Sequence, residues 1–131
     1  MAVPVYDTSR WPIFQARMPT EPMLEHEFAD HVERLIRLFA TEKRVALLID
    51  ARGAHPLNAV QRSAIAAVYR KAFEREPHGV VGVAVVLSSA VERGIMTAIR
   101  WASRTNLEAY AFATPEAAIA WLQEQLAATQ R

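Results

Sequence analysis

Two uninterrupted apolar runs constrain the fold of this chain more than any other feature. They are VALLI at residues 45–49 and VVGVAVVL at residues 80–87. Strands that are apolar on both faces are typical of parallel sheets covered on both sides. Each run is followed by a capping pattern and a helical stretch, first at Asn58 with Gln61 and then at Ser89 with Glu92. This alternation predicts an α/β domain with a largely parallel central sheet.

Shorter patterns predict the N-terminal part of the domain. Residues 3–7 and 13–18 are expected to form two strands separated by a turn, which adds an antiparallel edge to the sheet. A helix is expected to open within residues 19–22, with Thr20 as its cap and a proline in its first turn. Its apolar residues recur at helical spacing and are Leu24, Phe28, Val32, Leu35, Ile36 and Phe39.

The C-terminal part is predicted in the same way. Helices are expected from Asn58 to about Arg75 and from Ser89 to about Arg104, followed by a strand at residues 107–113. A last helix should start at Pro115, with Thr114 as its cap. The predicted order is therefore ββαβαβαβα, a mixed and mostly parallel sheet within one domain of residues 1–131.

Composition narrows the class of protein. A chain of 131 residues is long enough for one domain with a hydrophobic core, and its net charge of +1 does not indicate general nucleic-acid or membrane-surface binding. The chain has no Cys, which excludes disulfides and thiolate metal sites. No apolar run approaches the ~18 residues of a membrane span, and the N-terminus lacks a signal-peptide layout. We therefore expect a cytoplasmic protein without stable membrane insertion.

The segment HEFADH at residues 26–31 invites comparison with the zinc-binding pattern HExxH, but its second His comes one residue late. At ~100° per residue, positions five apart point roughly 140° away from each other. His26 and His31 therefore cannot share a metal ion. We predict a partly buried His31, a solvated His26 and no metal site. The chain also lacks the glycine-rich phosphate loops, so no cofactor is expected.

Asp50, Arg52 and His55 follow the predicted central strand at its carboxyl end. Ligands in open α/β sheets favour that edge. The alternative is that Asp50 binds the amides of its own loop and that Arg52 is solvated. An acid–base enzyme that uses Asp50 and His55 is the least favoured hypothesis, because no Ser or Cys nucleophile lies in this loop. No catalytic residue is predicted.

Two predicted helices carry side chains that packing against a core does not explain: a basic stripe on one and surplus apolar residues on the other. On the helix at 89–104, basic side chains share a narrow arc with apolar borders; they are Arg93, Arg100 and Arg104, flanked by Met96 and Trp101. This pattern fits an acidic partner or an anionic headgroup, and the alternative is an ordinary solvated face.

On the helix at 58–75, the predicted core face is Leu57, Val60, Ala64, Val68 and Ala72. Ile65, Tyr69 and Phe73 extend the apolar surface past half of the helix. An exposed apolar strip of this kind indicates a partner or self-association site. The alternative is a thicker core beneath a neighbouring helix.

Three segments together resemble the STAS-like proteins. They are DTSRWP at residues 7–12, DARG at 50–53 and FATPEAAIAWLQEQL at 112–126. This family is similar to the anti-sigma-factor antagonist of sporulation and is often grouped with the CRAL-TRIO lipid-transfer fold. The resemblance implies a mixed sheet with helices mainly on one face. It also implies a cytoplasmic, often dimeric, protein-binding module without catalytic activity.

Phospho-regulated members of that family carry roughly DLSGVPFIDSSG where this chain carries DARGAHPLNAVQ at residues 50–61. Asp50 and Gly53 match, and Asn58 stands where the family has Asp. Ala59 and Val60 stand where the family has its serines, and neither has a hydroxyl that could accept a phosphate. A phosphate at a helix start is electrostatically favourable and adds negative charge, so it can act as a switch. We predict that phosphorylation at this helix start does not occur in this protein.

The leading functional hypothesis is a non-enzymatic regulatory or scaffolding domain that binds a partner protein, a second copy of the chain, or both. Its predicted contact surface combines Asp50, Arg52, His55 and Asn58 with the two helix surfaces described above. The second hypothesis is a domain that binds a small apolar ligand or a lipid. That hypothesis rests on the resemblance and on Ile95, Met96, Ile99 and Trp101 near a cavity.

Overall fold

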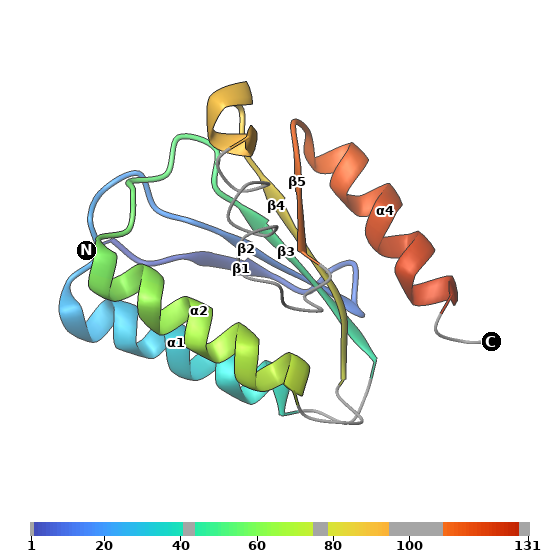
Figure 1. The fold of residues 1–131 in the computed structure, drawn as a ribbon, viewed down its shortest axis with the longest axis horizontal. Helices are drawn as coiled ribbons and strands as arrows, with labels where there is room; N and C mark the ends of the chain where they lie inside the picture. Colours follow the sequence, from blue (N-terminus) through green and yellow to red (C-terminus); the bar gives the residue numbers. More distant parts are fainter. Residues whose placement is uncertain (1, 41–43, 75–78, 95–108, 129–131) are drawn as a thin grey trace.

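The computed structural model describes residues 2–40, 44–74, 79–94 and 109–128. One five-stranded sheet runs through them in the order β1-β2-β3-β4-β5 (Figure 1). The strands are β1 (Val5–Asp7), β2 (Ile13–Arg17), β3 (Val45–Asp50), β4 (Val80–Val86) and β5 (Ala109–Phe112). β1 is antiparallel to β2, and each later neighbour is parallel. The predicted mixed, mostly parallel sheet with an antiparallel edge is confirmed.

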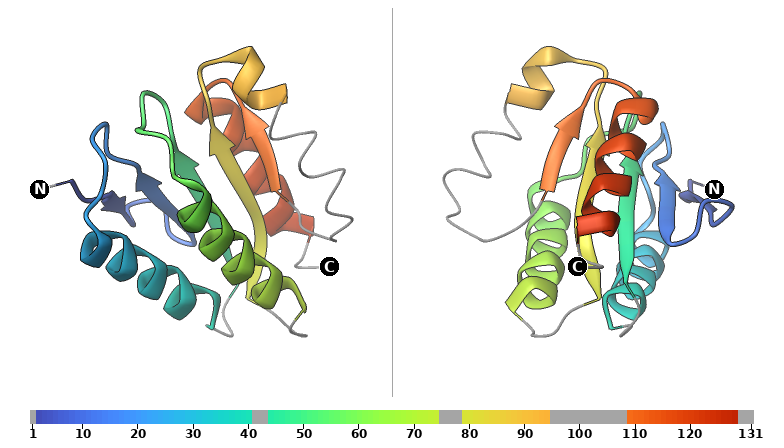
Figure 2. Two further views of the ribbon diagram at one scale, coloured as in Figure 1. Left: turned by 60° about the vertical axis from the view of Figure 1, so that its left-hand side comes forward. Right: turned by 90° about the vertical axis from the view of Figure 1, so that its right-hand side faces the viewer.

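Helices cover both faces of this sheet. α1 (Glu25–Phe39) and α2 (Ala59–Glu74) lie side by side on one face, and α4 (Pro115–Ala128) packs on the opposite face against β3, β4 and β5 (Figures 1 and 2). A further helical segment starts at residue 90 and is described through residue 94. The helices that join β2 to β3 and β3 to β4 therefore share a face, as the resemblance implied, whereas α4 covers the other side.

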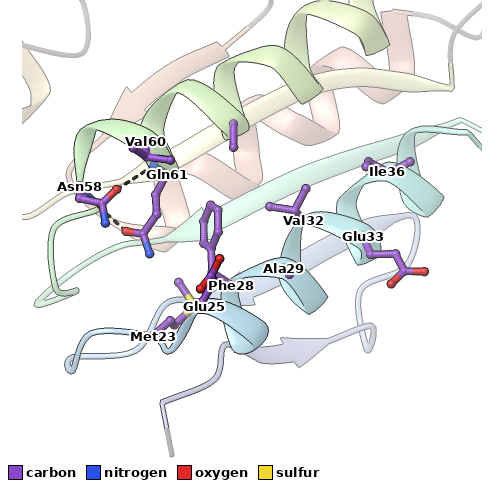
Figure 3. Close-up of a pocket in the computed structure, with 11 residues that line it drawn as sticks. Met23, Glu25, Phe28, Ala29, Val32, Glu33, Ile36, Asn58, Val60 and Gln61 are labelled. Atoms are coloured by element: carbon purple, nitrogen blue, oxygen red, sulfur yellow. Dashed lines mark hydrogen bonds between the residues drawn. The ribbon is translucent and has the colours of Figure 1, made fainter.

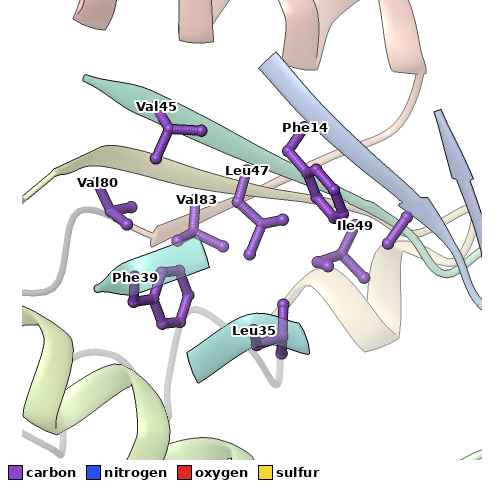
Figure 4. Packing of buried hydrophobic residues seen from close by; sticks show 9 residues of the cluster. Phe14, Leu35, Phe39, Val45, Leu47, Ile49, Val80 and Val83 are labelled. Carbon is purple, nitrogen blue, oxygen red and sulfur yellow. The ribbon is translucent and has the colours of Figure 1, made fainter. Parts of the chain in front are cut away.

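Alternating side chains of β3 supply both layers of the core. Val45, Leu47 and Ile49 point toward α1 and α2, and Ala46 and Leu48 point toward α4. Figure 4 shows the first layer, in which the strand side chains meet residues from α1. Its buried members are Phe14, Ala16, Leu35, Phe39, Val45, Leu47, Ile49, Val80 and Val83. The continuous apolar run thus reflects a strand that is covered on both faces.

The capping patterns explain where the helices begin. Asn58 and Gln61 form the predicted reciprocal box, because Asn58 Oδ1 accepts the Gln61 N–H at 2.8 Å and Gln61 Oε1 accepts the Asn58 N–H at 3.0 Å. Ser89 Oγ accepts the Glu92 N–H at 3.4 Å, and Thr114 Oγ1 accepts the Ala117 N–H at 3.2 Å. The predicted caps of these helices are confirmed.

The predicted start of α1 is wrong. The helix begins at Glu25, several residues after the predicted cap at Thr20. The carboxylate of Glu27 accepts the Leu24 N–H at 2.9 Å and so closes the first turn at that point. A buried Glu three residues after the cap therefore decides the helix start, and the two prolines remain in the connection before it.

Gly82 in β4 leaves room for the indole ring of Trp121 from α4 to pack on the sheet. A Cβ atom at residue 82 would lie 3.0 Å from Trp121 Cη2 and 3.2 Å from its Cζ3. The indole cannot easily retreat, because its ring centroid lies 4.9 Å from that of Tyr110 and 5.6 Å from that of Phe112. The missing side chain at residue 82 is therefore part of how α4 packs.

Gly82→Ala is expected to lower the free energy of unfolding by about 1–2 kcal/mol, because overpacking outweighs the strand preference that alanine brings. Chemical denaturation measures this difference. Gly94→Ala is the control without overpacking: a Cβ atom there meets nothing within 4 Å, and in its helical segment alanine is expected to raise the free energy of unfolding by about 0.5–1 kcal/mol. A Gly82→Ala protein as stable as the wild type would show that Trp121 can shift at no cost.

Candidate functional site

An apolar groove runs between α1 and the first turns of α2, and its lining extends along most of α1 (Figure 3). Its volume is about 640 Å³. Phe28 and Val32 point from α1 toward α2, and Val60 and Gln61 line the groove from the first turn of α2. The residues that line the groove are mostly apolar and are Met23, Glu25, Phe28, Ala29, Val32, Glu33, Ile36, Asn58, Val60, Gln61 and Ala64.

The groove exists because each helix contacts the sheet with one side only. On α1, the apolar side chains that turn inward are Phe28, Leu35 and Phe39, which are 9%, 0% and 5% exposed. Ile36 follows Leu35 by about 100° around the helix and remains 52% exposed. Val60 at the start of α2 is 79% exposed. Two large aliphatic side chains therefore face water along the walls of one groove, and apolar surface that is gathered in this way is typical of binding sites.

Of the two arrangements expected for the apolar surface of α2, the thicker core is the one found. Ile65, Val68 and Tyr69 pack against the core layer, so Ile65 and Tyr69 do not form an exposed strip. The Tyr69 ring centroid lies 5.5 Å from that of Phe39, and burial raises the pKa of the Tyr69 hydroxyl. Val60, which the sequence placed in the core, is the residue left outside. The side chain of Phe73 lies outside the described residues.

The loop after β3 is held by its own side chains. Asp50 receives two hydrogen bonds from the Arg52 guanidinium, at 3.0 Å from Nε and 2.8 Å from Nη2, and a third from the Arg52 main-chain N–H at 3.2 Å. These hydrogen bonds hold the pKa of the Asp50 carboxyl below its usual value. The expectation that Asp50 binds its own loop is confirmed, whereas Arg52 is ion-paired and not simply solvated.

The rest of this loop gives little support to an acid–base pair. The His55 main-chain N–H donates to the Pro19 carbonyl at 3.0 Å, which ties the loop to the connection before α1. The His55 side chain is exposed, and Asp50 is engaged by Arg52. Gly53 adopts a left-handed φ of 68°, which matches the glycine of the DARG pattern. The loop is therefore a compact turn beside the groove.

A buried polar cluster lies on the other side of α1. His31 and Glu27 are each 3% exposed, and His31 Nδ1 lies 2.7 Å from the Tyr6 hydroxyl. The Arg34 guanidinium sits 4.4 Å from the centre of the Tyr6 ring. Burial, together with the charge of Arg34, lowers the pKa of His31 to about 4, and burial raises the pKa of Tyr6. The predicted contrast between a buried His31 and an exposed His26 is confirmed.

The predicted basic stripe lies mostly outside the described residues, since Met96, Arg100, Trp101 and Arg104 fall within residues 95–108. The one described member, Arg93, donates from Nη1 to the Leu87 carbonyl at 2.7 Å. The cavity predicted around Ile95, Ile99 and their neighbours also falls in that range. Within the part of the chain that the structure describes, no three His, Cys, Asp or Glu side chains converge to hold a metal, and no helix could cross a membrane.

Ala59 and Val60 are the first two residues of α2. The Val60 side chain forms part of the apolar groove wall (Figure 3). Sequence reasoning missed the groove because it assigned Val60 to the core. The signal that could have revealed it was the surplus of apolar residues on both α1 and α2.

The comparisons with known proteins agree with this architecture. A family model described as SpoIIAA-like matches residues 17–123. The fold also resembles the crystal structure of an uncharacterised DUF3478-family protein with a SpoIIAA-like fold from Shewanella loihica PV-4. The TM-score is 0.64 at 15% sequence identity, and the match covers 92% of each chain. No curated protein shows significant similarity to the chain.

Proposed function

Because the chain belongs to the SpoIIAA-like family, we propose that it is a non-enzymatic protein-interaction domain whose contact surface is the groove between α1 and α2. The observation that carries this proposal is the exposure of Ile36 and Val60, at 52% and 79%, in the walls of a mostly apolar groove. Burying such side chains against a partner contributes about 25 cal/mol for each Å² of apolar surface removed from water. The loop of Asp50, Arg52, His55 and Asn58 would border that contact.

This surface would work without phosphorylation. A phosphate at the start of α2 would need a hydroxyl at residue 59 or 60, and both side chains there are aliphatic. Ser63 is exposed but lies one turn inside the helix, away from the first main-chain N–H groups that favour an anion. We therefore propose a constitutive contact surface in place of a phosphorylation switch.

The second candidate function is binding of a small apolar ligand or a lipid in the same groove. The volume of about 640 Å³ favours it, because ligand sites commonly span roughly 300–1,000 Å³. The exposure of Val60 speaks against it, since a ligand site normally encloses most of its ligand. A protein surface can cover both walls of an open groove, so protein binding is the preferred proposal.

Site-specific photo-crosslinking in cells distinguishes protein binding from lipid binding in the groove. A photoreactive phenylalanine analogue at residue 60 is expected to give adducts with protein, and the same analogue at residue 5 is the control. Val5 is also exposed, at 66%, but lies on strand β1 away from the groove. Lipid adducts at residue 60 would favour the second candidate. Equal adduct yields at residues 60 and 5, or none at residue 60, would remove the groove as the contact surface.

A further inference from the structure

The charge of the groove indicates what kind of protein segment would fill it. Of the eleven residues that line it, two are charged, and both are acidic: Glu25 and Glu33. They lie on α1 eight residues apart, which is about 12 Å along a helix. Glu33 is 60% exposed and pairs with Arg37 at 2.7 Å, an exposed ion pair of the kind that contributes little and rearranges readily. One wall therefore carries two carboxylates spaced by about two helical turns.

The backbone of the groove walls indicates the conformation of the occupant. Both walls are α-helices, whose main-chain groups are hydrogen-bonded within each helix away from its ends. An extended peptide would find no strand edge there to satisfy its own N–H and C=O groups. A helix satisfies those groups internally and needs only an apolar side to meet Val32, Ile36 and Val60. The occupant that fits this groove is therefore an amphipathic helix.

We propose that the groove binds an amphipathic helix of a partner protein that carries Lys or Arg seven or eight residues apart beside its apolar stripe. Its basic side chains would meet Glu25 and Glu33, and its apolar stripe would cover Val32, Ile36 and Val60. This inference rests on the proposed function and adds the chemistry of the partner. Opposite charges at the rim of such a contact mainly set specificity and orientation.

The direction of the bound helix also follows from the fold. α1 and α2 run parallel, with both N-termini at the same end (Figure 1). Their dipoles therefore add, and the positive end of each lies at the end of the groove where Glu25 is found. A third helix is favoured when its own dipole opposes theirs. The bound helix would accordingly place its C-terminus near Asn58 and its N-terminus near the end of α1.

A pair of synthetic helical peptides tests the charge preference. Both carry the same leucine stripe, with Lys at the two flanking positions in one peptide and Glu in the other. Wild-type protein is expected to bind the Lys peptide about tenfold more tightly, measured by fluorescence anisotropy. Glu25→Lys with Glu33→Lys should reverse the preference. Val60→Asp should abolish binding of both peptides, and Glu21→Lys, an exposed change outside the groove lining, should alter neither.

The absence of Cys from the chain makes the direction testable by disulfide trapping. A Cys at the C-terminus of the Lys peptide should form a disulfide with Ala59→Cys and not with Ala40→Cys, which lies just past the last turn of α1. The reverse result would overturn the direction. Equal affinity for both peptides, no binding of either, or no reversal in the double variant would overturn the charge inference. Protein adducts at residue 60 would still support the proposed function in that case. Without those adducts, both the proposed function and the inference about the bound helix would be wrong.

Discussion

Leu47→Ala is expected to lower the free energy of unfolding by about 3 kcal/mol. Leu47 lies in the central strand β3, is 0% exposed, and sits beside Phe14 of β2 and Val83 of β4 in the parallel register. Leu35 and Phe39 from α1 close the core layer on the helix side of Leu47 (Figure 4). Strands on both sides hold the backbone in place, so the site can collapse little around the lost side chain. Denaturation by urea, followed by circular dichroism, measures the loss.

Leu24→Ala is the matched control for this core substitution. It removes the same atoms from a side chain that is 58% exposed, and its expected effect lies within about 0.5 kcal/mol. The main-chain N–H of Leu24, which bonds to Glu27, is unaffected by the change. A loss at residue 47 no larger than the loss at residue 24 would contradict the placement of Leu47 between the strands and α1.

Between pH 6.5 and about pH 4, the protein is expected to lose about 3 kcal/mol of stability through His31 alone. Burial lowers the pKa of His31 from 6.5 to about 4 in the folded state. As the pH falls through this window, His31 becomes protonated in the unfolded chain but stays neutral in the folded chain. The contribution of neutral His31 to the free energy of unfolding is therefore complete above pH 6.5. It declines as the pH falls through the window and is lost below about pH 4.

Comparison with His31→Gln isolates this contribution. The Gln side chain does not titrate and can still accept a hydrogen bond from the Tyr6 hydroxyl, which lies 2.7 Å from His31 Nδ1 in the wild type. The free energy of unfolding, measured at steps from pH 7 to pH 4, should fall more steeply for the wild type. Parallel curves would mean that the folded protein accommodates a charged His31, for example beside the buried Glu27, whose Oε2 has no partner within the described residues.

Much of the fold could be predicted from local patterns. The two apolar runs became β3 and β4, and the caps at Asn58, Ser89 and Thr114 all formed as the sequence indicated. These features were predictable because a strand covered on both faces and a helix cap each depend on a few neighbouring residues. The start of α1 was missed because a single carboxylate, Glu27, competed with the Thr–Pro signal and determined the first turn.

The candidate site was less predictable, because it depends on how two helices turn about their axes. α2 is apolar around more than half of its circumference, so several rotations would have buried a comparable set of side chains. The neighbouring α1 and the sheet selected the rotation that turns Ile65 and Tyr69 inward and leaves Val60 in the groove. The amino-acid sequence by itself determined the elements, their order and the aliphatic residues Ala59 and Val60 at the start of α2. Only the tertiary structure decided which apolar side chains remain exposed, because that choice depends on contacts between residues far apart in the chain.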